Sequence, residues 1–138
     1  MANISSDVIR GYNDTIILAL LLHKPSYGYE ISRVIRLRTR EKYIIKETTL
    51  YSAFNRLQKN GLVESYSDIG PENGKRRTYY RITDAGRSYY TEKCDEWELT
   101  KEVVEEFVEP KRNDKETDPQ KDPVTKGDEE NGTDKELS

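Results

Sequence analysis

Polar side chains that could contact a nucleic acid share one side of the segment 47–59. At helical spacing this side carries hydrogen-bond donors and cations: Thr48, Ser52, Asn55, Arg56 and Lys59, with Thr49 and Tyr51 on its flanks. Asn and Arg are the side chains that pair with the edges of adenine and guanine, whereas hydroxyl and ammonium groups bind phosphate. No acidic residue follows Glu47 in this segment. The pattern therefore predicts a helix that binds DNA in the major groove.

Three of these side chains also have a simpler interpretation. The Tyr51 hydroxyl can hold a phosphate, or the ring can pack beside Leu50, and its angle on the helix favours the phosphate. Asn55 can pair with adenine and Arg56 with guanine, but either can instead contact only the DNA backbone or water. For Asn55 and Arg56 both interpretations stay open.

A second cationic group follows the turn 68–74, whose Gly-Pro and Asn-Gly pairs are typical of a hairpin loop. Two strands are predicted around it, over 62–67 and 75–82, with Tyr80 and Ile82 alternating with Tyr79 and Arg81. Lys75, Arg76 and Arg77 stand at the exit of the loop. Three adjacent cations repel one another in water, which favours a role in binding the phosphate backbone.

This chain has few of the residues that catalysis or metal binding requires. There is one cysteine, Cys94, and one histidine, His23, so neither a cysteine-based zinc site nor a His-led metal cluster is expected. No Gly-rich phosphate loop or activated nucleophile is evident. We therefore predict no cofactor, no metal and no enzymatic activity.

Membrane insertion is not expected either. The longest apolar run, Ile16 to Leu22, has seven residues, whereas a helix that spans a bilayer needs roughly 20. The first six residues are uncharged and include no apolar run, unlike a signal segment. The sequence thus predicts a soluble, cytoplasmic protein.

Charge is unevenly distributed along the 138 residues. The net charge is −3, yet residues 1–90 hold 15 basic and 9 acidic side chains. Residues 91–109 hold 2 basic and 8 acidic ones, and residues 110–138 hold 6 and 9. Because electrostatic attraction acts locally, the first of these regions is a basic domain despite the acidic average.

The same divisions suggest the domain organisation. Only Val124 and Leu137 are apolar among the last 29 residues, too few to offset the entropy of ordering, so 110–138 is predicted to be a disordered acidic tail. Residues 1–82 are predicted to form the DNA-binding domain. Residues 83–109 are predicted to form a separate C-terminal helix.

Helical periodicity predicts three helices before the hairpin. The first begins at Asp7, capped by Ser5 or Ser6, and runs to Leu22. Pro25 is expected to end the first helix, and Ser26 is expected to cap a second helix that reaches about residue 37. The third extends from Glu47 to the stop at 60–61 and buries an apolar stripe: Leu50, Ala53, Phe54 and Leu57. Three helices and a basic hairpin predict a mainly α winged helix-turn-helix fold.

The last helix is expected to mediate dimerisation. Thr83 caps it, and it can run to Val108 with a seam of apolar residues: Tyr90, Cys94, Trp97, Val104 and Val108. A helix of this length extends past a small domain. Its seam can then be buried only against another chain, which predicts a homodimer.

Three separated motifs resemble the PadR family of bacterial transcriptional regulators: residues 27–31 (Tyr-Gly-Tyr-Glu-Ile), 49–62 (Thr-Leu-Tyr, then Arg-Leu and Gly-Leu) and 75–83 (Lys-Arg-Arg-Thr-Tyr-Tyr-Arg-Ile-Thr). The single C-terminal helix is similar to that of the short subfamily. The resemblance implies a homodimeric winged-helix repressor that binds a palindromic double-stranded DNA operator and releases it when an effector binds. It assigns Tyr51, Ser52, Asn55 and Arg56 to the reading helix and Lys75, Arg76 and Arg77 to the wing. The expected DNA-binding set also includes Tyr27 and Lys46, although the family commonly has a Ser or Asn cap where Lys46 stands.

The resemblance also implies a small-molecule site. In short members that bind several drugs, paired tryptophans from the two C-terminal helices stack flat aromatic ligands, and Trp97 falls at the matching place. Asn13, Ile16 and Val104 would be its neighbours. From the residues alone, a packing role in the seam is favoured for Trp97, and only the resemblance makes the ligand role comparable. An alternative to DNA regulation is a winged-helix module for protein–protein assembly. Such a surface would tolerate mixed charge, whereas the outer face of segment 47–59 is cationic and has no acidic residue after Glu47.

Overall fold

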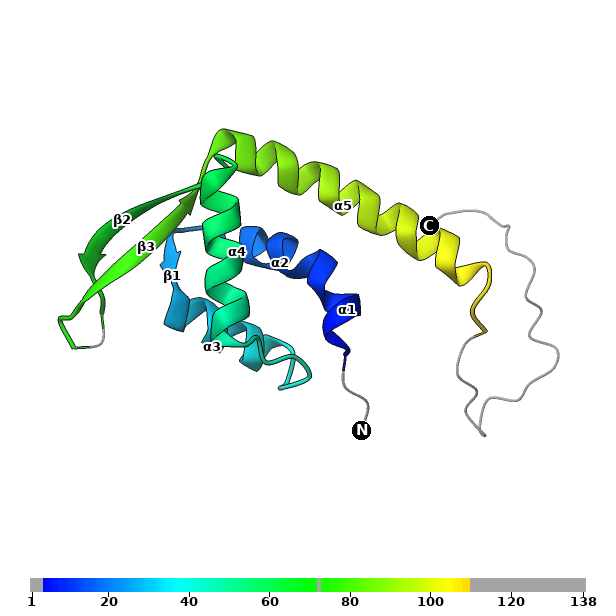
Figure 1. Ribbon diagram of the computed structural model, residues 1–138, viewed down its shortest axis with the longest axis horizontal. Coiled ribbons are helices and arrows are strands. Elements are labelled where there is room, and N and C mark those ends of the chain that lie inside the picture. Colours follow the sequence, from blue (N-terminus) through cyan, green and yellow to red (C-terminus); the bar gives the residue numbers. More distant parts are fainter. Residues whose placement is uncertain (1–3, 72, 110–138) are drawn as a thin grey trace. The chain divides into compact units, whose positions relative to one another are not determined.

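The computed structural model describes residues 4–71 and 73–109 and is mostly helical with one small sheet (Figure 1). In chain order the elements are α1 (Ser6–Ile9), the 3-10 helix η1 (Arg10–Tyr12), α2 (Asn13–Leu21), β1 (Ser26–Tyr27), α3 (Gly28–Arg38), α4 (Glu47–Lys59), β2 (Val63–Ile69), β3 (Arg76–Ile82) and α5 (Asp84–Glu105). This confirms the predicted fold class. Residues up to Val103 form one compact unit, and a second begins at Val104, of which residues 104–109 are described. The tail predicted for 110–138 lies outside the described residues.

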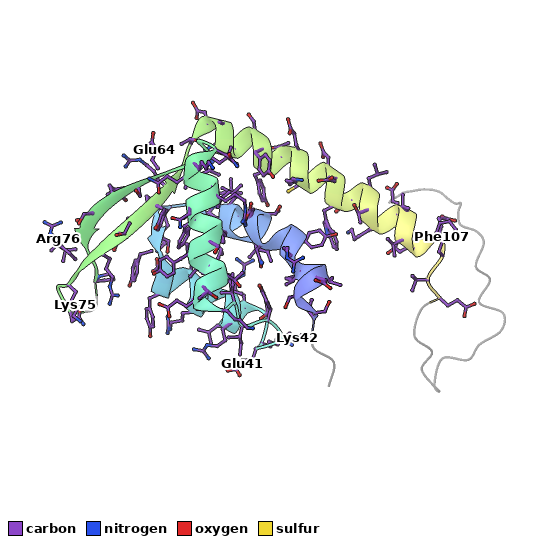
Figure 2. All side chains as sticks on the ribbon, in the orientation of Figure 1. Glu41, Lys42, Glu64, Lys75, Arg76 and Phe107 are labelled. Atoms are coloured by element: carbon purple, nitrogen blue, oxygen red, sulfur yellow. The ribbon has the colours of Figure 1, made fainter. Side chains whose placement is uncertain are left out.

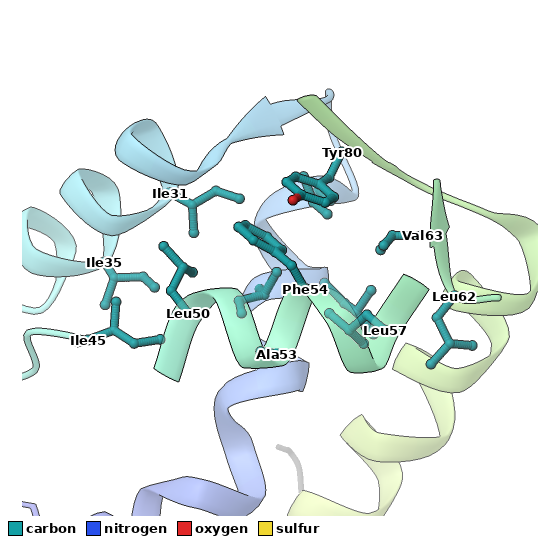
Figure 3. Packing of buried hydrophobic residues seen from close by; sticks show 13 residues of the cluster. Ile31, Ile35, Ile45, Leu50, Ala53, Phe54, Leu57, Leu62, Val63 and Tyr80 are labelled. Carbon is teal, nitrogen blue, oxygen red and sulfur yellow. The ribbon is translucent and has the colours of Figure 1, made fainter. Parts of the chain in front are cut away.

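Helix α4 supplies the centre of the core. Its predicted stripe is buried, with Ala53, Phe54 and Leu57 fully inaccessible and Leu50 nearly so. The Phe54 ring stacks on Tyr80 of β3 with 3.9 Å between ring centroids and 12° between planes (Figure 3). Residues of α2, α3 and β2 complete the cluster. Because one face of α4 is held in this way, its opposite face is presented to solvent.

The sheet contains a strand that the sequence did not reveal. Its order is β1-β3-β2, and all pairs are antiparallel, with Val63 opposite Ile82 and Ser26 opposite Tyr80. The expectation that Ser26 caps the second helix was wrong: Ser26 pairs in β1 and its hydroxyl donates to Glu30. Tyr27 occupies the N-cap position of α3, and its side chain does not cap the helix. A strand of two residues is too short to show a periodicity of its own.

The hairpin strands differ from their predicted bounds. β2 starts one residue later than expected and continues to Ile69, and β3 starts at Arg76. Tyr80 is buried as predicted, but Thr78 on the same side of the strand is exposed. The core therefore covers only the end of the hairpin that lies near α4.

The predicted first helix is divided into three segments. Ser5 caps α1 as expected, accepting a hydrogen bond from the Val8 amide at 3.3 Å. The α-helix is then interrupted by η1, which contains Gly11, a poor helix former. Val8 is 61% exposed, and the buried apolar residues of this region begin only within α2.

Helix α5 begins as the sequence predicts. The Gly86 amide donates to the Thr83 hydroxyl at 3.0 Å, which makes Thr83 the cap. The helix ends at Glu105, three residues before the predicted end at Val108. Among the helices of the described ranges, none is both long and apolar enough to cross a bilayer.

Buried tyrosines make the stability sensitive to alkaline pH. Burial raises the pKa of Tyr80 above its ordinary 10.0, and burial also raises the pKa of Tyr43, opposed by its hydrogen bond with Asn13. The unfolded chain therefore loses these protons first, so stability that is complete below pH 10 falls as the pH rises beyond it. We expect urea midpoints to fall between pH 9 and 11, and to fall less for Tyr80→Phe. Equal slopes for the two proteins would contradict this.

Candidate nucleic-acid interface

The outer face of α4 carries the predicted contact residues. Exposed side chains along it are Lys46 at the cap position, Thr48, Tyr51, Ser52, Asn55, Arg56 and Lys59, with Thr49 half-buried. Lys46 makes no side-chain capping bond, and Thr48 lies inside the helix rather than capping it. The first turn closes instead through the Leu50 amide and the Lys46 carbonyl at 2.9 Å.

Arg56 is engaged within the protein. Its Nε and Nη2 donate to the two carboxylate oxygens of Asp14 on α2, at 2.9 and 2.5 Å. This hydrogen bonding raises the pKa of the Arg56 guanidinium. Guanine reading by Arg56 would require this pair to open. Sequence reasoning missed Asp14, since no local pattern links residues on two helices 42 positions apart.

The wing cations are not equivalent. Lys75 and Arg76 are exposed at the loop end of the hairpin (Figure 2), where Arg76 Nη1 donates to the Ser67 hydroxyl at 3.2 Å. Arg77 is half-buried instead, with its guanidinium carbon 5.1 Å from the ring centroid of Tyr27 and 5.9 Å from that of Tyr29. Lys75 and Arg76 are therefore the cations best placed for a phosphate backbone.

The Tyr27 ring packs against side chains of β3, the second strand of the wing. Only 3% exposed, it meets the edge of Tyr79 at 5.1 Å. Tyr79 in turn stacks on Tyr66, and Arg81 lies over Tyr66 at 4.6 Å. The structure thus places Tyr27, which was predicted to contact DNA, under Arg77 within a series of aromatic rings. In this position it can orient a cation more readily than it can reach a nucleic acid.

A groove joins the reading helix to the wing. A cavity of about 570 Å³ is lined by residues from the starts of α3 and α4 and from β3, among them Gly28, Tyr51, Arg76 and Thr78. Tyr51 is 42% exposed and lies with its hydroxyl end against Gly28. Its hydroxyl therefore faces the same space as Arg76, an arrangement that suits a DNA backbone strand.

Gly28→Ala tests the placement of this hydroxyl. A Cβ there would lie under 3.0 Å from the Tyr51 hydroxyl and ring carbon, so the tyrosine must turn away. We expect about tenfold weaker DNA binding, because a hydrogen bond to a charged group is lost, measured by fluorescence anisotropy. Tyr51→Phe is the matched variant. A loss with Gly28→Ala but none with Tyr51→Phe would show that the hydroxyl is not the contact.

Trp97 lines a separate cavity of about 360 Å³ between α5 and the N-terminal helices. It is 42% exposed, meets the edge of Tyr12 at 5.1 Å, and has the Lys101 ammonium 5.6 Å from its ring. The other lining residues are Asp7, Val8, Gly11, Thr15, Lys93, Glu96 and Thr100. Sequence reasoning missed Tyr12 and Thr15 here, although their spacing from Val8 is helical.

The expected neighbours of Trp97 (Asn13, Ile16 and Val104) are not among the residues that line this cavity. Asn13 is 3% exposed and bonded to Tyr43, and Ile16 lines another cavity with residues of α3. Val104 belongs to the second unit. Along the expected dimer seam, Tyr90 and Cys94 are half-buried, whereas Val104 and Val108 are 48% and 60% exposed. No cluster of three or more metal-ligating side chains occurs in the described ranges.

Comparisons with known proteins agree with this arrangement. The transcriptional regulator PadR-like family matches residues 17–92. An uncharacterized protein of Lysinibacillus sphaericus is 47% identical over 106 residues, which cover 77% of this chain and 96% of that protein. A transcriptional regulator structure from Clostridium thermocellum is 65% identical with a TM-score of 0.69, covering 77% of this chain and 99% of that one. A PadR family regulator structure from Clostridium difficile is 35% identical with a TM-score of 0.62, covering 72% and 100%.

Proposed function

Because the chain belongs to the PadR-like family of transcriptional regulators, we propose that this DNA-binding regulator is a ligand-responsive homodimeric repressor. It binds a palindromic operator through α4 and the wing. The observation that carries the proposal is the groove shared by Tyr51 of α4 and Arg76 of β3, next to an outer helix face with no acidic residue after Glu47. In this assignment Ser52 and Asn55 read base edges, while Tyr51, Lys75 and Arg76 bind phosphates.

Exposed apolar side chains on and just after α5 support a homodimer. Trp97, Leu99, Val103, Val104, Phe107 and Val108 are each at least 42% exposed. A second copy of the same helix would remove this surface from water, which is favourable. Two-fold symmetry then matches a palindromic operator when the two copies of α4 lie about 34 Å apart.

Trp97 supports the ligand response. A half-exposed indole beside Tyr12 offers a stacking surface for a flat aromatic molecule. Binding there alters the packing of α5 against the N-terminal helices and shifts the dimer away from its DNA-competent state. The extent of release is set by the ligand's differential affinity for the two states.

Fluorescence anisotropy tests the DNA-binding part. A labelled duplex from the gene's own upstream region is compared with a scrambled duplex at two salt concentrations. Preference for the upstream duplex that persists at the higher salt supports sequence-specific regulation. Equal, salt-sensitive binding to both duplexes contradicts an operator in that region. No binding at either salt favours the protein–protein assembly module.

Trp97→Ala tests the ligand part. We expect loss of aromatic-ligand binding with a dimer retained, since five other exposed apolar side chains remain for the dimer contact. Isothermal titration with a panel of planar aromatic compounds measures the first effect, and sedimentation velocity measures the second. Leu99→Ala, which removes another exposed apolar side chain of α5, is the control. Unchanged ligand affinity in Trp97→Ala would rule out this site.

A further inference from the structure

Three consecutive residues at the start of α2 contact three different parts of the molecule. We call residues 12–14 the junction segment. The Tyr12 ring packs edge to face with Trp97, Asn13 accepts a hydrogen bond from the Tyr43 hydroxyl at 2.6 Å, and Asp14 pairs with Arg56. Tyr43 precedes α4 and Arg56 is in its last turn. The segment therefore contacts the loop that leads into α4 and the last turn of α4.

The pair at the far end of α4 is bidentate, with two guanidinium nitrogens on two carboxylate oxygens. This geometry fixes orientation as well as distance. The Asp14 side chain is only 19% exposed, compared with 49% for Arg56. The bidentate contact with Asp14 already engages the face of the guanidinium that would pair with guanine, so Arg56 suits a structural link better than base contact.

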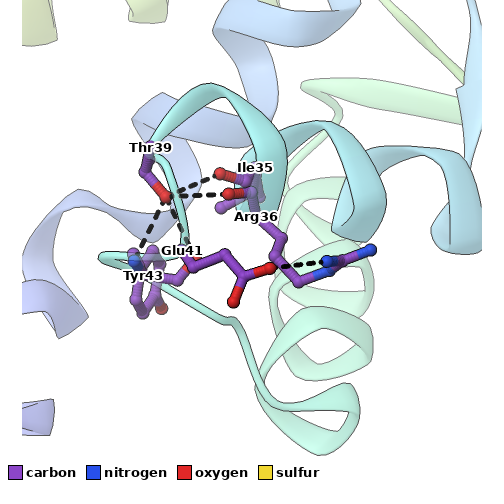
Figure 4. Close-up of polar contacts among 5 residues, drawn as sticks. All are labelled: Ile35, Arg36, Thr39, Glu41 and Tyr43. Carbon is purple, nitrogen blue, oxygen red and sulfur yellow. Dashed lines mark hydrogen bonds and ion pairs between the residues drawn. The ribbon is translucent and has the colours of Figure 1, made fainter.

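The hydrogen bond between Tyr43 and Asn13 connects α2 to the loop before α4, whose conformation is fixed by its own hydrogen bonds. Arg40 and Glu41 adopt positive φ values of 55° and 63°, a conformation that costs energy for residues other than glycine. The Thr39 hydroxyl donates to the Ile35 carbonyl at 2.8 Å and accepts from the Tyr43 amide at 3.1 Å, and Arg36 pairs with Glu41 (Figure 4). These bonds set the place of Tyr43, and buried Asn13 ties it to α2.

We propose that Asn13 and Asp14 are positioning residues for operator binding, which hold α4 at the angle that its base contacts require. The inference rests on the DNA-binding part of the proposed function and not on the effector. It also assigns Arg56 a role as a link rather than as a base reader. Since the junction segment starts at Tyr12, the same residues connect the Trp97 cavity to the reading helix.

Removing the charge of Asp14 tests the proposal, because the two roles of Arg56 predict opposite changes in DNA affinity. If Arg56 reads DNA, Asp14→Asn frees the arginine and removes a negative charge, so binding tightens. If Asp14 positions α4, the same variant weakens specific binding. The measurement is anisotropy of a labelled duplex that the wild-type protein selects from a random pool, with a scrambled duplex beside it.

We expect Asp14→Asn to bind the selected duplex about tenfold more weakly, about 1.4 kcal/mol, with no loss on the scrambled one. Asp7→Asn is the matched control, because Asp7 forms an exposed ion pair with Arg10, only three residues further along the chain. Tighter binding by Asp14→Asn, or equal losses in Asp14→Asn and Asp7→Asn, would overturn the proposal.

A double-mutant cycle tests whether Asp14 acts through Arg56. With Arg56→Gln, the double variant Asp14→Asn/Arg56→Gln is expected to bind the selected duplex no more weakly than Asp14→Asn alone, since both changes break one link. Independent effects that add, with loss from Arg56→Gln and gain from Asp14→Asn, would assign Arg56 to DNA contact instead.

Amide hydrogen exchange gives a readout without DNA. In Asp14→Asn we expect the amides of α4 to exchange faster while those of α3 do not, because only α4 loses its link. Uniformly faster exchange in both helices, or no change in α4, would contradict positioning. If the wild-type protein selects no duplex, the DNA-binding function fails, and hydrogen exchange still decides whether Asp14 holds α4.

Discussion

Replacing both Lys75 and Arg76 with alanine is expected to weaken binding to every duplex, specific or scrambled. Both side chains are exposed at the end of the hairpin and neither forms an ion pair with a carboxylate in the described ranges. In a dimer the double variant removes four cations, and each phosphate contact contributes about 0.9 to the slope of log affinity against log salt. We expect that slope to fall by about 3 to 4, and the affinity at 0.1 M salt to fall about 100-fold.

Anisotropy titrations at four salt concentrations measure both quantities. Arg81→Ala is the matched control, because Arg81 lies on the same strand but pairs with Glu64 at 3.2 Å. Asn55→Ala provides the contrast: it should change which base is preferred at one operator position while leaving the salt slope intact. If the wing variant loses affinity only for the operator, or Asn55→Ala only lowers the slope, the assignment of phosphate and base contacts is wrong.

Gly86→Ala is expected to cause the largest loss of folding stability. A Cβ at this buried position would lie well under 3.0 Å from the Leu62 carbonyl oxygen and from the Ile82 side chain. The carbonyl is backbone and already accepts from the Thr83 amide at 3.0 Å, so it cannot move without disturbing the cap of α5. We expect the free energy of unfolding to fall by about 3 kcal/mol.

Urea unfolding followed by circular dichroism measures this loss. Gly11→Ala is the control, since a Cβ there meets nothing within 4 Å, and it should leave stability unchanged or raise it by about 0.5 kcal/mol. A Gly86→Ala protein as stable as wild type would mean that α5 can shift away from Leu62 at little cost.

Local patterns in the chain were sufficient to predict most elements. The buried stripe of α4, the capping of α5 by Thr83 and the hairpin loop all depend on residues within about seven positions of one another. The predicted and observed bounds of elements differ where the local sequence pattern is weak. Gly11 interrupts a helix that the apolar spacing predicts as continuous, and β1 is only two residues long. Such segments take their conformation from partners distant in the sequence.

The candidate DNA surface also has one part that local sequence predicts and one part that it does not. Which residues face outward on α4 follows from the helical period, because the stripe of Leu50, Phe54 and Leu57 must face the core. That Lys75 and Arg76 stay in solvent while Arg77 packs over Tyr27 does not follow from three adjacent cations. It depends on how β1 is paired with β3 in the sheet.

The sequence by itself determined most of the helices, the wing and the chemistry of the candidate DNA surface, because periodicity and capping act over a few residues. Only the tertiary structure decided that Arg56 is held by Asp14, that Asn13 holds Tyr43, and that Trp97 meets Tyr12. Those pairs join residues 30 to 85 positions apart. Their formation depends on how the core packs α2 against its neighbours, and no local spacing encodes that packing.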